Sequence, residues 1–177
     1  MSSDPFRFIP FERSHAEAML SWRYPAPYDF YNQAPEGSEQ RVNQLLAQAA
    51  DYFAIVDGED QMIGFRTFGP SARIDGGDYR QDALDISGGL RPDFMARGLG
   101  RQVTMAAMAL GLEKFQPKRF RTTIPVFNER AKSICRSLGF SAWSEFQRPS
   151  DGMRFEVWVA RAARQTNAPY ETRNPGF

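Results

Sequence analysis

The chain has 177 residues, with 22 lysines and arginines against 21 aspartates and glutamates. This length fits one domain with its own core, and a net charge of +1 argues against broad electrostatic binding of nucleic acid. A single cysteine, Cys135, and a single histidine, His15, exclude an intramolecular disulfide and the common thiolate–imidazole zinc sites, so we expect no metal.

The expected location follows from what the sequence does not contain. The N-terminal residues lack the charged and apolar regions of a signal peptide, and no apolar run approaches the length of a membrane span. An unpaired cysteine agrees with a reducing compartment. We therefore expect a cytoplasmic protein that does not enter the membrane.

The first half of the chain predicts the order strand, helix, helix, strand, strand. These elements are expected at residues 6–9, 14–22, 38–49, 52–56 and 61–68. Ser14 and Glu17 have the spacing of a capping box at the start of the first helix. Between the two helices, residues 23–37 carry three prolines and four aromatic residues, which is typical of a structured loop.

The second half predicts four strands and two helices. They are expected at residues 83–90, 98–115, 120–126, 128–138, 140–146 and 153–160. Only the run from 83 to 126 has the strand–helix–strand form that requires a parallel crossover. We therefore expect an α/β fold of the α+β type, with a mixed, mostly antiparallel sheet of about seven strands flanked by helices. Residues 1–163 would form one domain, followed by a polar tail at 164–177.

A glycine motif opens the third predicted helix directly after a strand and a short loop. Gly98-Leu99-Gly100 permits a tight turn, and the free amides of a helix start bind anions. Arg97 and Arg101 flank these amides, so a diphosphate is the natural ligand. The sequence contains no P-loop, and Val103 stands where a dinucleotide motif needs its third glycine.

This motif and two later ones resemble the GNAT N-acetyltransferase superfamily. The later motifs are Asn128-x-x-Ala131 and Leu138-Gly139-Phe140. The resemblance implies acetyl-CoA as co-substrate and a splay between the fourth and fifth strands. It also implies a binding site for the coenzyme in which Leu90 pairs with the pantetheine arm. Asn128 would be a further residue of this site. The amides expected near the pyrophosphate are those of Met95, Ala96, Arg97, Gly98, Leu99, Gly100 and Arg101.

Two positions depart from the family's common residues. Met95 replaces a glutamine or arginine, and Cys135 replaces a tyrosine that protonates the leaving thiolate. Cys135 falls on the apolar face of its helix, so it either fills space or acts as the acid. A third reading, an acetyl-carrying thiol, lacks the base that usually activates such a group. Asn128 completes the predicted catalytic residues together with Cys135 and Asp85.

The sequence leaves two readings open for the catalytic base and for the acceptor site. Asp85 stands where some relatives keep a carboxylate base, and the alternative is a structural strand residue. Tyr24, Tyr28 and Tyr31 would line the acceptor pocket or cover the core, and Asp78 belongs to an acidic loop that would attract a cationic amine.

The resemblance implies an acetyl-CoA-dependent N-acetyltransferase in which a primary amine attacks the thioester directly. The acceptor would be a small molecule or a peptide, and members often form homodimers. The first alternative is a non-catalytic acyl-CoA-binding or regulatory module, and the second is an interaction protein without a coenzyme A site.

Overall fold

The computed structural model describes residues 5–32 and 38–162. Its strands are β1 (Arg7–Pro10), β2 (Tyr52–Val56), β3 (Met62–Phe68), β4 (Leu84–Leu90), β5 (Arg119–Pro125), β6 (Ser141–Gln147) and β7 (Arg154–Arg161). Its α-helices are α1 (Arg13–Ser21), α2 (Glu39–Ala47), α3 (Leu99–Phe115) and α4 (Glu129–Ser137). The tail expected at 164–177 lies outside the described residues.

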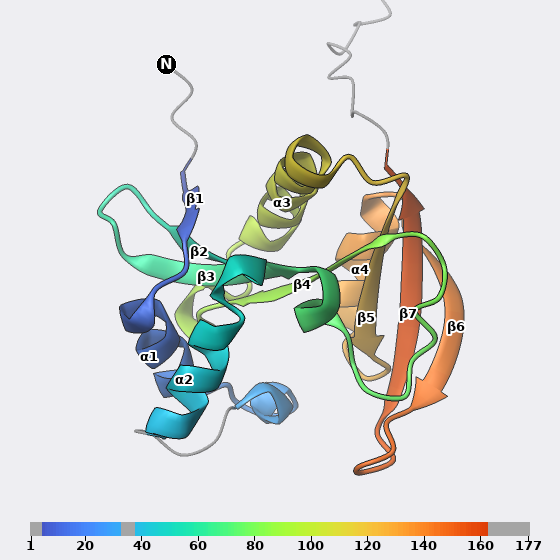
Figure 1. Cartoon of the computed structure of the whole chain (residues 1–177), viewed down its shortest axis with the longest axis horizontal. Helices are drawn as coiled ribbons and strands as arrows, with labels where there is room; N and C mark the ends of the chain where they lie inside the picture. Colours follow the sequence, from blue (N-terminus) through green and yellow to red (C-terminus); the bar gives the residue numbers. More distant parts are fainter. Residues whose placement is uncertain (1–4, 33–37, 163–177) are drawn as a thin grey trace, which may run out of the picture.

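The strands form one seven-stranded sheet in the order β1-β2-β3-β4-β5-β7-β6. All neighbouring strands are antiparallel except β4 and β5, which confirms the mixed, mostly antiparallel α/β sheet predicted from the sequence. α1 and α2 cover one face of β1–β4, and α3 lies on the other (Figure 1). Among the described residues, no helix is long and apolar enough to cross a membrane.

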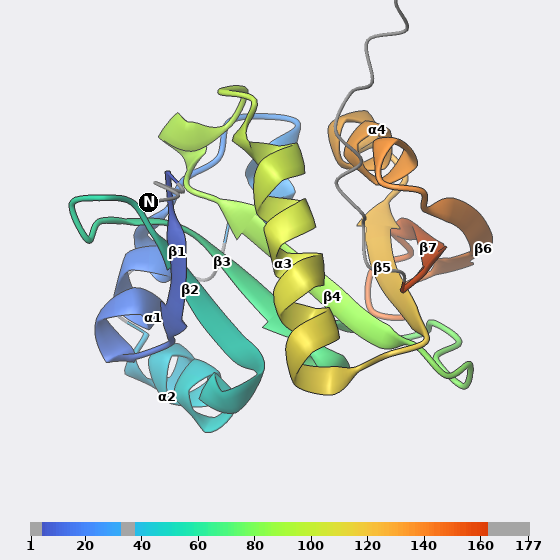
Figure 2. The same cartoon turned by 90° about the horizontal axis from the view of Figure 1, so that it is seen from above.

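The sheet splays between β4 and β5. These two strands pair only at Leu84↔Phe120 and Asp85↔Arg121. Beyond that point β4 continues along β3 to Leu90, whereas β5 continues along β7 to Pro125. Figure 2 shows the two strands meeting near their starts and diverging toward their ends. This confirms the predicted splay, and it leaves the later part of β4 without a strand on its β5 side.

The start of α1 corrects one prediction. The N-cap is Glu12 rather than Ser14, and the helix ends at Ser21. The Glu12 side chain accepts from the His15 amide, while His15 Nδ1 accepts from the Glu12 amide at 3.0 Å. A carboxylate and an imidazole three residues apart thus satisfy two free amides of the helix start.

Candidate active site

The loop before α3 turns into the helix through left-handed backbone. Gly98 is the N-cap with φ of 77°, and Ala96 has φ of 64°. A left-handed non-glycine residue such as Ala96 is uncommon and clusters at ligand-binding turns. The amides of Leu99, Gly100 and Arg101 occupy the first turn, where no carbonyl of the helix is available to them. This turn therefore presents free donors to an anion, as the motif predicts.

The two motif glycines have different structural causes. A Cβ on Gly98 would meet nothing within 4 Å, so Gly98 serves the left-handed turn alone. A Cβ on Gly100 would lie 2.7 Å from Ile134 Cδ1 of α4. The second glycine therefore lets α3 and α4 approach each other beside the splay.

Two cations flank the helix start without ion-pair partners. Arg97 and Arg101 are exposed, and neither has a salt bridge among the described residues. Arg97 stacks on the Phe94 ring with 4.5 Å from Cζ to the ring centroid. Arg91, by contrast, is already paired with Asp93 at 2.7 Å. Arg97 and Arg101 are thus available to a phosphate, whereas Arg91 is not.

The end of β4 carries the first predicted acceptor residue. Tyr24 donates its hydroxyl to the Leu90 carbonyl at 2.8 Å, and Leu90 pairs with Gly64 of β3. Desolvation by burial raises the pKa of Tyr24, so its phenol stays protonated. Tyr24 is therefore fixed on the strand that was expected to pair with pantetheine.

Tyr31 lies beside Tyr24 and connects to the start of α4, where the Tyr28 ring contacts Phe127. Asn128 accepts from the Ala131 amide as N-cap, and its Nδ2 donates to the Tyr31 hydroxyl at 2.8 Å. Burial raises the pKa of Tyr31 to about 12, although the Asn128 bond opposes this rise. The Tyr31 ring lies 6.1 Å from that of Tyr24, and all three tyrosines come from the segment around the short helix Tyr28–Tyr31. This arrangement brings three predicted substrate residues between the end of β4 and the start of α4.

Asp85 is buried in an ionic cluster. Its carboxylate accepts from Arg121 Nε at 2.5 Å and Nη2 at 2.8 Å, and from Arg73 Nε at 2.7 Å. Asp85 is only 2% exposed, and Arg121 is 1% exposed. Both oxygens already hold guanidinium groups, so these contacts favour the structural alternative over the base. Arg73 and Arg121 carry no signal in the sequence, because their partner Asp85 is distant along the chain.

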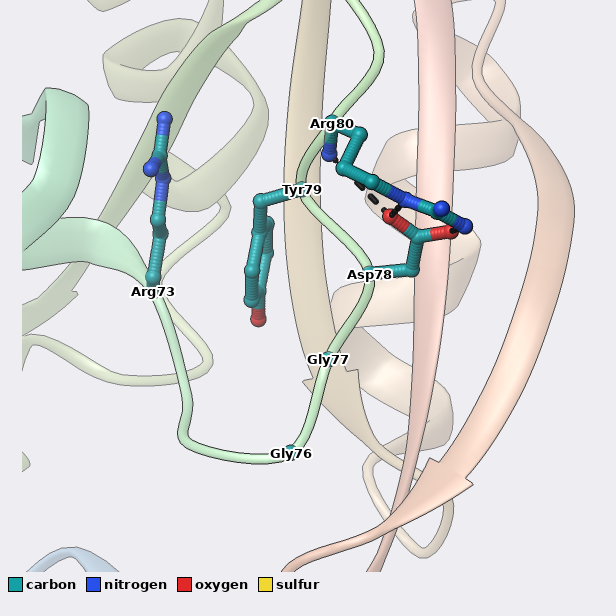
Figure 3. A pocket seen from close by; sticks show the side chains of 6 residues that line it. All are labelled: Arg73, Gly76, Gly77, Asp78, Tyr79 and Arg80. Atoms are coloured by element: carbon teal, nitrogen blue, oxygen red, sulfur yellow. Dashed lines mark hydrogen bonds and ion pairs between the residues drawn. The ribbon is translucent and has the colours of Figure 1, made fainter.

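Asp78 lies on the loop between β3 and β4 and contributes to a shallow surface pocket (Figure 3). Its carboxylate is paired with Arg80 at 2.7 Å, which holds its pKa well below the usual range. No contact among the described residues joins Asp78 to the three tyrosines. Its neighbour Gly76 packs against Pro149 in the turn between β6 and β7. The pocket is lined by Arg73, Gly76, Gly77, Asp78, Tyr79 and Arg80.

Cys135 lies on the buried face of α4, as its spacing predicts, with 6% exposure. Burial raises the pKa of its thiol to about 11, although Arg66 and Arg136 oppose this rise. An ordinary thiol has a pKa of about 8.5, so proton transfer from Cys135 to a coenzyme A thiolate is unfavourable. The raised pKa favours the space-filling reading of Cys135 over the acid.

The structure adds Arg66 of β3, which belongs to none of the sequence motifs. Its Nη2 donates to Thr104 Oγ1 of α3 at 2.8 Å, and Thr104 in turn donates to the Gly100 carbonyl. The available signal was a lone arginine within the otherwise largely apolar strand Met62–Phe68. Among the described residues, no group of three or more histidine, cysteine or carboxylate side chains could hold a metal ion.

Comparison with known proteins identifies the architecture. A model described as "Acetyltransferase (GNAT) domain" matches residues 6–141. A chimeric spermidine N-acetyltransferase from Vibrio cholerae and hSSAT superposes with a TM-score of 0.72 at 12% identity, covering 90% of this chain and 96% of that one. A GNAT-family acetyltransferase from Bacillus anthracis gives 0.71 at 13% identity, with 91% and 97% covered.

A third structure widens the range of acceptors among the neighbours. A ribosomal-protein-S5-alanine acetyltransferase from Vibrio fischeri gives a TM-score of 0.62 at 16% identity, covering 93% of this chain and 97% of that one. No curated protein matches the sequence. At these identities the structural matches show the shared fold alone.

Proposed function

Because the chain belongs to the GNAT acetyltransferase family, we propose that it is an acetyl-CoA-dependent N-acetyltransferase that acts on a primary amine. The observation that carries this proposal is the start of α3. Free amides follow the left-handed Gly98, and the unpaired cations Arg97 and Arg101 stand beside them at the mouth of the splay. A diphosphate ester with a long extended arm fits this combination of charge and open strand edge.

Two elements would bind acetyl-CoA, namely the start of α3 and the free edge of β4. The amides of residues 99–101, with Arg97 and Arg101, would hold the pyrophosphate. Met95 and Ala96 shape the preceding turn. The β5-facing edge of β4 up to Leu90 would pair with the pantetheine arm, because β5 has diverged there. Acetyl-CoA supplies an acetyl group activated as a thioester.

The protein's part in the reaction is binding, orientation and polarisation. Backbone amides of β4 near Leu90 would polarise the thioester carbonyl. The neutral phenols of Tyr24 and Tyr31 would orient the acceptor nitrogen, because both hydroxyls are held at the splay. The amine proton passes to water, since Asp85 is enclosed by two arginines.

The acceptor class is a small molecule or a peptide with a primary amine. Among the similar structures, one is named for spermidine and another for the alanine of a ribosomal protein, so the fold itself accommodates both classes. The cytoplasmic location and a homodimer stay predictions of the sequence.

Calorimetric titration with acetyl-CoA tests the binding site. We expect Arg97→Gln and Arg101→Gln each to weaken binding by about tenfold, since each removes a charge-assisted contact to phosphate. The matched control is Arg119→Gln, which removes an exposed arginine from the start of β5. Absence of acetyl-CoA binding by the unaltered protein contradicts the proposal.

Turnover is tested with a panel of amines that includes spermidine and an alanyl peptide, with products identified by mass spectrometry. We expect Tyr31→Phe to raise the KM of the accepted amine by several-fold, while the affinity for acetyl-CoA stays unchanged. Binding of acetyl-CoA without turnover on any amine favours the alternative of a regulatory acyl-CoA-binding module. That alternative arises because Cys135 stands where the family commonly has a tyrosine.

A further inference from the structure

Arg66 extends from β3 across the backbone of β4. Arg66 is paired with Gly88 of β4. Residues opposite each other in a sheet share a face, so the Arg66 side chain lies on the same face as Gly88. A Cβ on Gly88 would lie 2.8 Å from Arg66 Cδ and 3.0 Å from its Nη1. Gly88 also has φ of 150°, a conformation that side chains rarely adopt. The glycine therefore leaves the space through which the guanidinium reaches the α3 side of the splay.

The guanidinium is only partly satisfied there. Nη2 donates to Thr104 Oγ1, but Nε is buried and has no hydrogen-bond partner. Among the described residues, no carboxylate forms an ion pair with Arg66. Burial lowers the pKa of Arg66 to about 10, which still leaves it charged at neutral pH. A partly buried cation with an unused buried donor is costly unless an anion arrives during function.

The groups that face this cation come from three elements. α3 contributes Thr104, α4 contributes Cys135, and β4 contributes the backbone at Gly88 with the apolar Ile86 on the same face. Arg136 of α4 is a second positive charge that acts on Cys135. These neighbours supply no negative charge, so an anion in the splay would be attracted by Arg66.

The proposed reaction creates such an anion. The amine nitrogen forms a bond to the acetyl carbon, the carbon–sulfur bond breaks, and its electron pair remains on sulfur as a thiolate. The proton leaves the nitrogen for water, so the thiolate needs a cation rather than an acid. We propose that Arg66 lies beside the sulfur of bound acetyl-CoA and stabilises the departing coenzyme A thiolate.

This inference rests on the proposed function and assigns to Arg66 a catalytic role that neither the motifs nor Cys135 supply. It follows that bound coenzyme A should have a lowered thiol pKa. An opposite charge within about 4–6 Å shifts a pKa by about 1–3 units. Arg66 should therefore favour the thiolate of the product even in the absence of an acceptor.

The test compares the affinities of coenzyme A and desulfo-coenzyme A between pH 6.5 and 9.5. The two ligands share every titrating group except the thiol, so their affinity ratio isolates sulfur ionisation. Measurements are made in Cys135→Ala, which removes the chain's single thiol. With Arg66 present, we expect the ratio to rise by about tenfold or more with pH.

Arg66→Met removes the charge and retains an apolar stem, whereas Arg66→Lys retains the charge. We expect Arg66→Met to abolish the rise of the ratio and to lower kcat by at least tenfold, and Arg66→Lys to preserve part of both. If Arg66→Met strongly lowers the melting temperature of the protein, the same measurements are made with Arg66→Gln, which also removes the charge.

A ratio that does not change with pH in the Arg66-containing protein overturns the inference without any Arg66 variant. An equal rise in Arg66→Met also overturns it. If one of these two results is obtained while coenzyme A still binds and amines are still acetylated, the proposed function stands and only the role of Arg66 is contradicted. If neither coenzyme A nor acetyl-CoA binds, both proposals fail.

Discussion

At the scale of single residues, Asp85 illustrates how partners decide the role of a carboxylate. Asp85→Asn would leave the buried Arg121 and the neighbouring Arg73 without a compensating charge. Removing one partner of a buried ion pair costs about 3–5 kcal/mol. We therefore expect urea unfolding to show a loss of that size, while kcat per folded molecule changes by less than about twofold, since the base role is not needed.

The control for Asp85 is Asp78→Asn, because the ion pair of Asp78 with Arg80 is exposed. Exposed pairs contribute little to stability, so we expect an unchanged urea midpoint for this variant. The opposite result for Asp85→Asn, an unchanged stability with a loss of about 100-fold in kcat, would identify Asp85 as the base after all.

Cys135 provides a second residue-scale prediction, which concerns pH. Its thiol has a raised pKa of about 11, so the folded protein holds this proton more tightly than the unfolded chain does. The contribution of Cys135 to the free energy of unfolding should therefore fall as pH rises from about 8.5 toward 11. Alkylation by iodoacetamide measures the same pKa directly, because Cys135 is the single cysteine of the chain.

We expect the alkylation rate of folded protein to keep rising about tenfold per pH unit between pH 7.5 and 10. The urea-unfolded chain is the control, and its rate should level off near pH 8.5. Levelling near pH 8.5 in the folded protein would mean that the thiol is not desolvated, and it would restore Cys135 as a candidate acid.

At the scale of elements, the contact between α3 and α4 depends on one glycine. Gly100→Ala would place a Cβ 2.7 Å from Ile134 Cδ1, which is the flexible end of a side chain. Overpacking of this kind costs about 1–3 kcal/mol. We expect a loss near the lower limit in urea unfolding, and recovery of most of it in the double variant Gly100→Ala/Ile134→Val, which removes the contacted methyl group.

Gly98→Ala is the matched control for this contact. It also destabilises, by about 1–2 kcal/mol, but through the left-handed backbone rather than through a collision. Ile134→Val should therefore not rescue it. Equal rescue of both alanine variants would contradict the separate causes assigned to the two glycines.

Local patterns predicted the elements well, because periodicity and turn residues act over a few positions. The strand–helix–strand run, the glycine turn and the buried face of α4 are all local in this sense. The start of α1 was misplaced, since Glu12 and His15 form a capping box two residues before the one expected from Ser14 and Glu17. A polar side chain can cap a helix from more than one position, so spacing alone does not select it.

Long-range clusters could not be predicted in the same way. The partners of Asp85 come from the β3–β4 loop and from β5, and Arg66 meets α3 and α4 only after the sheet has formed. The sequence showed charged residues within apolar strands, which marks them as exceptional. It did not show which charge would find an ion-pair partner, as Asp85 does, and which would have none among the described residues, as is the case for Arg66.

At the scale of the whole molecule, two halves of the sheet are joined at β4 and β5 by two paired positions. One half consists of β1–β4 with α1, α2 and α3, and the other of β5–β7 with α4 (Figure 2). A ligand in the splay would contact both halves. Binding should therefore raise the free energy of unfolding of the protein. It should also oppose local opening between the two halves of the sheet.

Acetyl-CoA at 100 times its dissociation constant should stabilise the protein by about 2.7 kcal/mol in urea unfolding. Hydrogen exchange locates this effect. We expect the largest gain in protection along residues 86–90 of β4 and at the start of α3, and a smaller gain, no more than the global stabilisation, along the ladder between β1 and β2. The ladder serves as the internal control, because it lies on the far side of β3. Protection confined to the surface turn 76–80, with none along β4, would place the ligand outside the splay and contradict the binding mode.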